Sequence, residues 1–225
     1  MKTYIDIFKI FADLHLFLKE NGITFANNGY PVFCEEFILR EVPHEILPFS
    51  HRNACKDKSK TVICFFENDK FLYRRFLKLK DDLPVYKEYL GVCGFDLSPR
   101  IGWSVESQKF NICLSQMATI YLALHGIKII PNFRIGLLEE TISSLASYPV
   151  ECPFAIGTIG CSQGKVMELE KFYFQTKVLY VLSKELFFYG QLKSEYKEIL
   201  LENGISYKVF QDFRTHCFNR KENIK

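Results

Sequence analysis

The stretch that decides the fold reads GIKIIPNFRIG (residues 126–136), LLEETISSLASYP (137–149) and VECPFAIGTIGCSQG (150–164) without a break. A short β-branched run is followed by a polar loop and a short helical pattern, and a second apolar run then leads into a glycine-rich turn. This succession is two consecutive strand–helix steps. The chain repeats it on either side, which indicates an α/β fold.

About six apolar runs read as strands, and helical patterns separate nearly all of them. The strands are expected at residues 61–66, 91–95, 127–131, 154–159, 186–190 and 205–210. The helices between them are expected at residues 71–81, 107–125, 137–147, 165–183 and 193–203. Strands joined by helical crossovers form a mostly parallel sheet. Because a closed barrel needs eight units and about 250 residues, we expect an incomplete TIM-like barrel or an open doubly wound sheet.

An N-terminal amphipathic helix precedes the α/β region. Apolar residues recur at helical spacing through residues 3–20, and Asn21-Gly22 is a typical stop signal. Residues 23–50 read as irregular, with prolines that prevent a long helix. The expected organisation is a helix and an extended segment packed on the core, an α/β domain and a polar tail, over residues 1–40, 41–212 and 213–225 respectively.

The composition limits the classes of function. Of the 225 residues, 48% are apolar, which provides for a full core and argues against disorder. The net charge of +3 is too small to indicate a nucleic-acid or membrane partner by itself. No apolar run is long enough for a transmembrane helix, and the N-terminus does not read as a signal peptide. The 8 cysteines lack C-x-x-C spacing, which favours free thiols and a cytoplasmic location.

Polar side chains follow four of the expected strands at the points where the strands end. Both candidate architectures bind ligands at the carboxyl edge of parallel strands, so we expect these side chains to share one site. Carboxylates beside arginines suit acid/base chemistry, a divalent metal ion or a phosphorylated ligand. The candidate catalytic residues are Glu67, Asp69 and Asp96. The candidate ligand-binding residues are Ser98, Arg100, Asn132, Arg134, Thr158, Gly160 and Cys161. These residue types also commonly cap strands and helices.

The turn GTIGCSQGK (157–165) follows a strand and opens a helix, where backbone N–H groups can bind an anion. It does not have P-loop spacing, which would need a glycine at position 159 and a hydroxyl at position 166. Cys161 in this turn is either an activated thiolate at the start of a helix or a buried inert thiol.

A series of short segments carries a family pattern. They are VPHEILPF (42–49), FFENDKF (65–71), GVCGFDLSP (91–99), HGIKIIPNFRIG (125–136), FAIGTIGC (154–161) and LFFYG (186–190). In this order and spacing they resemble a family of bacterial and bacteriophage proteins, the domain of unknown function 4417. The resemblance implies a prokaryotic or phage origin, with the bacterial cytoplasm as location, and it supplies no reaction.

The family pattern also bears on the candidate site. It has an acidic residue after the first strand, which Asp69 matches, and a segment like S-P-D-F-S after the second. Asp96 and Ser98 match that segment, but Cys93-Gly94 replaces the preceding Ser-Pro. The resemblance therefore does not extend to any role of the missing serine.

Two classes of function stay open. The first is an enzyme acting on a small phosphorylated or nucleotide-like molecule, with Asp96 and Asp69 as the acid/base or metal pair and Arg100 and Arg134 as anion-binding groups. The second is a non-catalytic phage or mobile-element accessory protein that binds nucleic acid or a host protein. Its surface would include lysines and arginines at residues 51–60, 70–80 and 214–225. Within it, Arg74, Arg75, Lys78 and Lys80 form a basic patch with the neighbours Phe71, Tyr73 and Phe76. Neither class involves a membrane.

Overall fold

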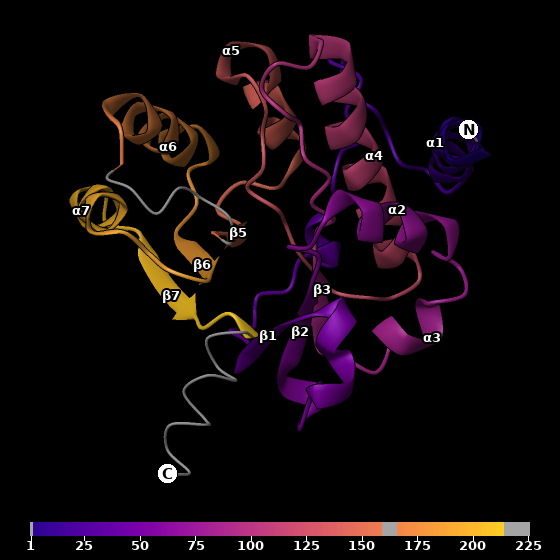
Figure 1. The fold of residues 1–225 in the computed structure, drawn as a ribbon, viewed down its shortest axis with the longest axis horizontal. Coiled ribbons are helices and arrows are strands. Elements are labelled where there is room, and N and C mark those ends of the chain that lie inside the picture. Colours follow the sequence, from indigo (N-terminus) through magenta and orange to yellow (C-terminus); the bar gives the residue numbers. More distant parts are fainter. Residues whose placement is uncertain (1, 159–165, 214–225) are drawn as a thin grey trace.

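The computed structural model describes residues 2–158 and 166–213, and within them it has seven strands flanked by helices (Figure 1). The strands are β1 (Glu45–Pro48), β2 (Thr61–Cys64), β3 (Gly91–Cys93), β4 (Ile129–Ile130), β5 (Phe154–Gly157), β6 (Glu185–Tyr189) and β7 (Ser206–Phe210). The α-helices are α1 (Lys2–Glu20), α2 (Asp69–Leu77), α3 (Leu83–Tyr86), α4 (Val105–Leu124), α5 (Leu138–Thr141), α6 (Glu168–Val181) and α7 (Ser194–Glu202). Short 3₁₀ helices lie at Glu35–Phe37, Phe49–Ala54, Lys58–Lys60 and Ile142–Ser147.

The strands form two parallel sheets, with orders β1-β2-β3-β4 and β5-β6-β7. The predicted parallel α/β class and the N-terminal helix are confirmed. Strand order follows the chain in both described sheets, so neither has the reversal that defines a doubly wound sheet. The sequence predicted about six strands in one sheet, whereas the structure has seven described strands in two sheets. The strand that was not predicted is β1. Its end at Pro48 is compatible with an edge strand, where a missing N–H group is tolerated.

A short joint connects the two sheets. The amide of Ala155 in β5 donates to the carbonyl of Pro131 (2.8 Å), and the amide of Phe133 donates back to the carbonyl of Ala155 (3.1 Å). Asn132 and Ala155 form the corresponding parallel bridge. The segment that continues β4 therefore pairs with β5, and the seven strands follow one another in chain order across both sheets.

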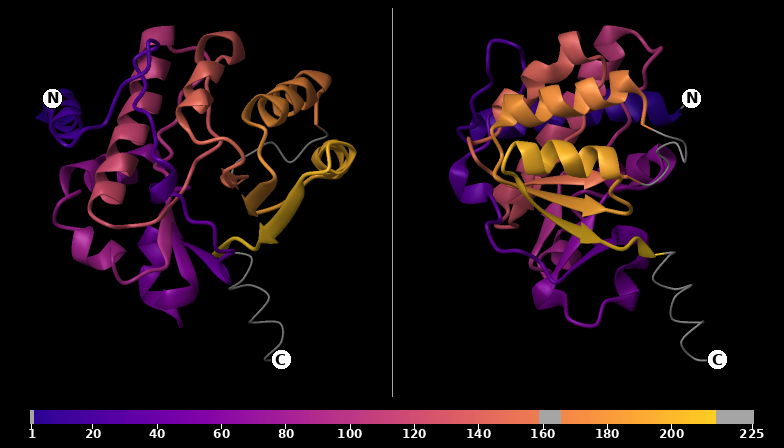
Figure 2. Two further views of the ribbon diagram at one scale, coloured as in Figure 1. Left: turned by 180° about the vertical axis from the view of Figure 1, so that it is seen from behind. Right: turned by 90° about the vertical axis from the view of Figure 1, so that its left-hand side faces the viewer.

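The core has three parts. One buried cluster takes side chains from every strand: Ile46, Val62, Cys64, Cys93, Ile130, Ala155, Phe187, Tyr189 and Phe210, with Leu39 and Phe66 beside them. A second cluster packs α1, α2 and α4 on the other face of the four-stranded sheet. A third packs α6 and α7 on the other face of the three-stranded sheet (Figures 1 and 2). Alternate residues of each strand thus face opposite layers, as the two-residue period requires.

The predicted helix at residues 137–147 is divided. It consists of α5 followed by the 3₁₀ helix Ile142–Ser147. The Thr141 hydroxyl donates to the carbonyl of Leu137 (2.7 Å) and accepts from the amide of Gly136 (2.9 Å). Hydroxyl side chains compete in this way for backbone partners, which weakens a regular α-helix.

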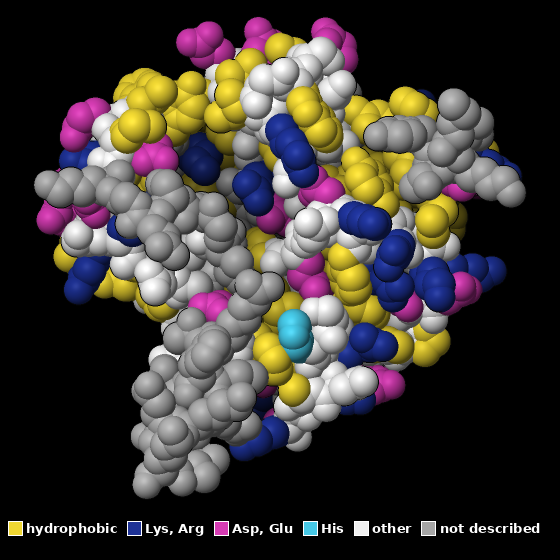
Figure 3. Space-filling model, viewed as in Figure 1, with side chains coloured by type: hydrophobic (Ala, Val, Ile, Leu, Met, Phe, Trp, Pro, Cys, Tyr) yellow, Lys and Arg dark blue, Asp and Glu magenta, His cyan; other side chains and the backbone are white. Residues whose placement is uncertain are grey.

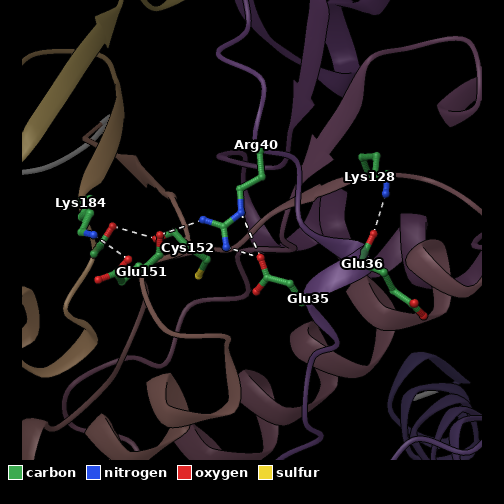
Figure 4. Close-up of polar contacts among 8 residues, drawn as sticks. Glu35, Glu36, Arg40, Lys128, Glu151, Cys152 and Lys184 are labelled. Carbon is green, nitrogen blue, oxygen red and sulfur yellow. Dashed lines mark hydrogen bonds and ion pairs between the residues drawn. The ribbon is translucent and has the colours of Figure 1, made fainter.

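Polar contacts also connect the segment before β1, in the four-stranded sheet, with the segment before β5, in the three-stranded sheet. Figure 4 shows Arg40 of the first segment between Glu35 and Glu151. Arg40 Nη1 donates to the carbonyl oxygen of Glu151 (2.9 Å), and its Nε donates to Glu35 Oε1 (3.1 Å). Lys184, just before β6, donates to Glu151 Oε2 (2.7 Å). Because these side chains are exposed, each pair contributes at most about 1 kcal/mol, and they serve mainly to position the chain entering β5.

Candidate functional site

A cavity of about 460 Å³ opens at the carboxyl edge of the strands. The end of every described strand contributes to its wall, through Pro48, Phe66, Glu67, Asp96, Arg134, Gly157, Tyr189 and Asp212. The remaining lining residues are Ser50, His51, Asn68, Phe71, Ser98 and Phe213. The arrows of β5, β6 and β7 all point toward this side (Figure 2, right), and acidic, basic and histidine side chains surround its centre (Figure 3).

The wall of the cavity depends on a glycine. A Cβ atom on Gly157 would lie only 2.4 Å from the Phe66 ring. Glycine at the end of β5 therefore allows the Phe66 ring to approach the backbone closely and to line the cavity.

Asp96 and Arg134 form a bidentate ion pair on the cavity wall. Arg134 Nε and Nη2 donate to the two carboxylate oxygens of Asp96 at 2.8 and 2.9 Å. Asn132 Nδ2 donates to Asp96 Oδ1 (2.8 Å) and also to the carbonyl of Phe95 (3.1 Å). Asp96 is buried and the Arg134 side chain is 45% exposed, so a fixed carboxylate orients a guanidinium that still reaches the cavity. The structure thus brings three predicted site residues together.

Asp69 and Arg100 lie in a different place. The amide of Ser98 donates to Asp69 Oδ1 (3.0 Å), and Arg100 Nη2 lies 3.3 Å from Asp69 Oδ2. Asp69 and Arg100 line a second cavity of about 660 Å³, bounded by aromatic residues that include Trp103. Asp69 and Asp96 therefore do not line one common cavity as the sequence led us to expect. Ser98 borders the first cavity and links it to Asp69.

Glu67 is the predicted carboxylate that is least engaged by the rest of the protein. It lines the first cavity, and its hydrogen bonds come from Ser50: the Ser50 amide donates to Glu67 Oε2 at 3.3 Å, and the Ser50 side chain also hydrogen-bonds to the carboxyl group. Burial raises the pKa of Glu67, and the Ser50 hydrogen bonds and the charges of His51 and Arg75 oppose this shift. In the described part of the chain Glu67 has no ion pair. A carboxyl group with a raised pKa in a cavity suits proton transfer.

Of the remaining predicted residues, Thr158 is described and is not among the residues that line the cavity. The amide and hydroxyl of Thr158 both donate to the carbonyl of Tyr189, at 3.0 and 3.2 Å, so Thr158 extends the pairing of β5 with β6. Gly160 and Cys161, with the rest of the glycine-rich turn, lie outside the described residues.

The lining residues that were not predicted include Ser50, His51, Tyr189 and Asp212. Ser50 Oγ and His51 Nδ1 are 2.8 Å apart, and the His51 ring centre lies 4.0 Å from that of Phe213. The Tyr189 hydroxyl accepts from the amide of Phe213 (2.9 Å). Ser50 and His51 were missed because the sequence read as a solvated loop after an irregular segment. The short EILP sequence of β1 could have predicted a strand that ends just before Ser50 and His51.

Fewer side chains of the predicted basic surface are accessible than the sequence suggested. Arg74, Lys78 and Lys80 are exposed, and Lys and Arg side chains gather over α2 and α3 (Figure 3). Arg75 instead pairs with Asp82 at 2.8 Å, with both side chains mostly buried. Of the aromatic neighbours, Phe76 is buried in the core and cannot stack on a base.

The described ranges contain neither a cluster of metal-ligating side chains nor a helix that could span a membrane. No group of three or more His, Cys, Asp or Glu side chains there has the arrangement of a metal site. No helix there is both long and apolar enough to cross a bilayer.

The family model described as Domain of unknown function (DUF4417) matches residues 36–208. The chain belongs to the DUF4417 family. The DUF4417 match contains Glu67, Asp96 and Arg134 and the whole of β1 to β6, so the family region includes most of the cavity wall. No curated protein matches the chain, and no solved structure does. Membership of the DUF4417 family confirms the resemblance noted from the sequence and assigns no activity.

The Asp96–Arg134 pair predicts a stability effect. Asp96→Asn removes the charge that binds Arg134 and leaves an amide facing the guanidinium. We expect a loss of about 2 kcal/mol in the free energy of unfolding, seen as a fall of about 4–8 °C in Tm. Asp13→Asn, on the exposed face of α1, is the matched control and should leave Tm unchanged. An Asp96→Asn protein as stable as the wild type would contradict this account of the pair.

The raised pKa of Glu67 predicts a pH-dependent effect. Because folding favours the protonated form, the contribution of Glu67 to stability is present at low pH and is lost as the pH rises through its folded-state pKa. Glu67→Gln should therefore have a higher Tm than the wild type near neutral pH, and the difference should shrink below the ordinary pKa of 4.5. Thermal unfolding across this pH range measures it. Glu139→Gln, at an exposed carboxylate, should show no such trend, and a lower Tm for Glu67→Gln at neutral pH would refute the assignment.

Proposed function

We propose that the chain binds a small polar molecule in the cavity at the carboxyl edge and acts on it as an enzyme, with Glu67 exchanging a proton. One observation carries the proposal: residues at the ends of all seven described strands line a single cavity of about 460 Å³. Parallel α/β folds bind their ligands at this edge. The volume also lies in the range of small-molecule sites.

The residues of the cavity have distinct roles in this proposal. Glu67 is the general acid or base, because its carboxyl group is the least engaged of the predicted three. Asp96 is a positioning residue, since both of its oxygens bind Arg134. Arg134 contacts the ligand through N–H groups that do not face Asp96. Asn132 and Ser98 fix the backbone around Asp96 and Asp69.

The phosphorylated or nucleotide-like ligand expected from the sequence stays a prediction. Arg134 supports it, because guanidinium groups bind phosphate well. The three carboxylates among the described lining residues, Glu67, Asp96 and Asp212, disfavour it. Roles for Gly160 and Cys161 in the turn after β5, and a bound divalent metal ion, are likewise predictions.

We further infer that the two sheets form an incomplete barrel, with one cavity at its carboxyl end. The chain-order succession of strands, the Ala155 joint and the buried cluster shared by all seven strands support this. The division at residues 1–40, 41–212 and 213–225, the phage or mobile-element origin and the cytoplasmic location remain expectations from the sequence.

The alternative is a non-catalytic accessory protein that binds nucleic acid or a host protein. Its support is the exposed cluster of Arg74, Lys78 and Lys80. The pairing of Arg75 with Asp82 and the burial of Phe76 weaken it, because stacking on bases needs accessible rings. We therefore prefer the enzyme hypothesis.

A thermal-unfolding screen tests the proposed function. The panel contains amines, nucleotides, sugar phosphates, divalent metals and short DNA and RNA. A ligand at about 100 times its dissociation constant adds roughly 2.7 kcal/mol, or several degrees in Tm. We expect a shift with a small molecule, and we expect it to be lost in Ser50→Trp, which places an indole at the cavity wall.

Ser194→Trp is the control for that variant, because Ser194 is an exposed residue at the start of α7. It should keep the full ligand-induced shift. A shift produced by nucleic acid alone, with a steep loss on adding salt, would favour the accessory-protein hypothesis. A small-molecule shift that survives in Ser50→Trp would place the ligand elsewhere and contradict the proposal.

A further inference from the structure

We infer, on the basis of the proposed ligand site, that the cavity takes a small organic cation. The positively charged nitrogen of this ligand, a protonated amine or a quaternary ammonium group, lies against the carboxylate of Glu67 and beside aromatic rings of the wall. Three features support a cation: the balance of charge in the lining, the incomplete hydrogen bonding of Glu67 and the chemistry of the surrounding rings.

The described lining of the cavity is acidic. Its ionisable side chains other than the tyrosine are Glu67, Asp96, Asp212, Arg134 and His51. Asp96 and Arg134 bind each other through two hydrogen bonds, so their charges largely cancel. Asp212 has an interaction of its own within the chain. The charge that a ligand meets is therefore set chiefly by Glu67.

Glu67 has unused capacity for hydrogen bonds. A carboxylate has about four acceptor positions, and among the described residues only Ser50 supplies donors, through its side chain and through its amide at 3.3 Å. This distance is at the long end of the normal range. A partly buried carboxylate is stabilised most by a charged donor. A protonated nitrogen in the cavity would supply such a donor, and a quaternary ammonium group would supply the charge.

Aromatic rings complete the environment. Phe66, Phe71, Tyr189 and Phe213 line the cavity, and the negative face of such a ring attracts cations. One of these rings already has such a contact, because the guanidinium of Arg75, which does not line the cavity, lies 5.4 Å from the centre of the Phe71 ring. An acidic group surrounded by rings is a common way for proteins to recognise an ammonium ligand.

An anion meets the opposite conditions in the same space. It would lie close to the carboxylate of Glu67, and like charges repel. Arg134, the one arginine of the described wall, already directs two of its N–H groups to Asp96. The cavity therefore favours a cation over an anion of similar size.

The test compares three probes on the full chain by NMR titration at low salt. They are choline, its neutral carbon isostere with a tert-butyl group in place of the trimethylammonium group, and inorganic phosphate. We expect choline to shift the amide signals of Ser50 and Gly157 and to bind about tenfold more tightly than the neutral isostere. Glu67→Gln should remove this preference, and Glu139→Gln should retain it.

The possible failures separate the two proposals. Equal binding of choline and its isostere, a preference that survives in Glu67→Gln, or tighter binding of phosphate at the same amides would overturn the cation assignment and leave the ligand site intact. If none of the three probes shifts the amides of Ser50 and Gly157, the ligand site itself is contradicted, and the cation assignment with it.

Discussion

The pairing of the Pro131–Phe133 segment with β5 is the constraint on which the rest of the structure depends. Two backbone hydrogen bonds, from Ala155 to Pro131 and from Phe133 to Ala155, join a four-stranded and a three-stranded sheet. Proline at position 131 has no amide to donate, so only its carbonyl takes part. With this joint in place, every described strand contributes to one buried cluster, and all seven strands end around the same cavity. Without it, the chain would have two half-sites.

The same joint determines the chemistry of the cavity. Asn132 and Arg134 flank Phe133 in this segment, and both side chains bind Asp96 at the end of the neighbouring strand. The ion pair therefore connects the segments that follow β3 and β4. It lies on the edge of the sheet where Gly157, at the end of β5, also lines the cavity. Arg134 and Asp96 bind each other, whereas the hydrogen bonds of the Glu67 carboxyl group come from Ser50, which is why we propose Glu67 as the reactive group. A polar network thus holds this part of the wall together, and Glu67 lies outside it.

The sequence predicted the elements better than the site. Apolar runs such as TVIC and ELFFY are long enough to identify a buried strand, and the parallel class followed from the helices between them. The strand β1 was missed because its four residues lie next to prolines, and local patterns carry little signal at that length. The rule that ligands bind at the carboxyl edge selected Glu67, Asp96 and Arg134, and all three line the cavity there. It could not separate Asp69 from them, because Asp69 lies only two residues after Glu67, and packing decides which of the two cavities each side chain faces.

Amide hydrogen exchange measured residue by residue tests the central claim that the two sheets are one unit around one cavity. If the joint is part of the cooperative core, the amides of Phe133 and Ala155 should exchange only through global unfolding, as slowly as that of Ile63 in the four-stranded sheet. Protection of that size at both positions is the result that this account predicts. Exchange at Phe133 and Ala155 that is faster than at Ile63 by orders of magnitude would mean that the sheets separate independently, and it would contradict a shared site.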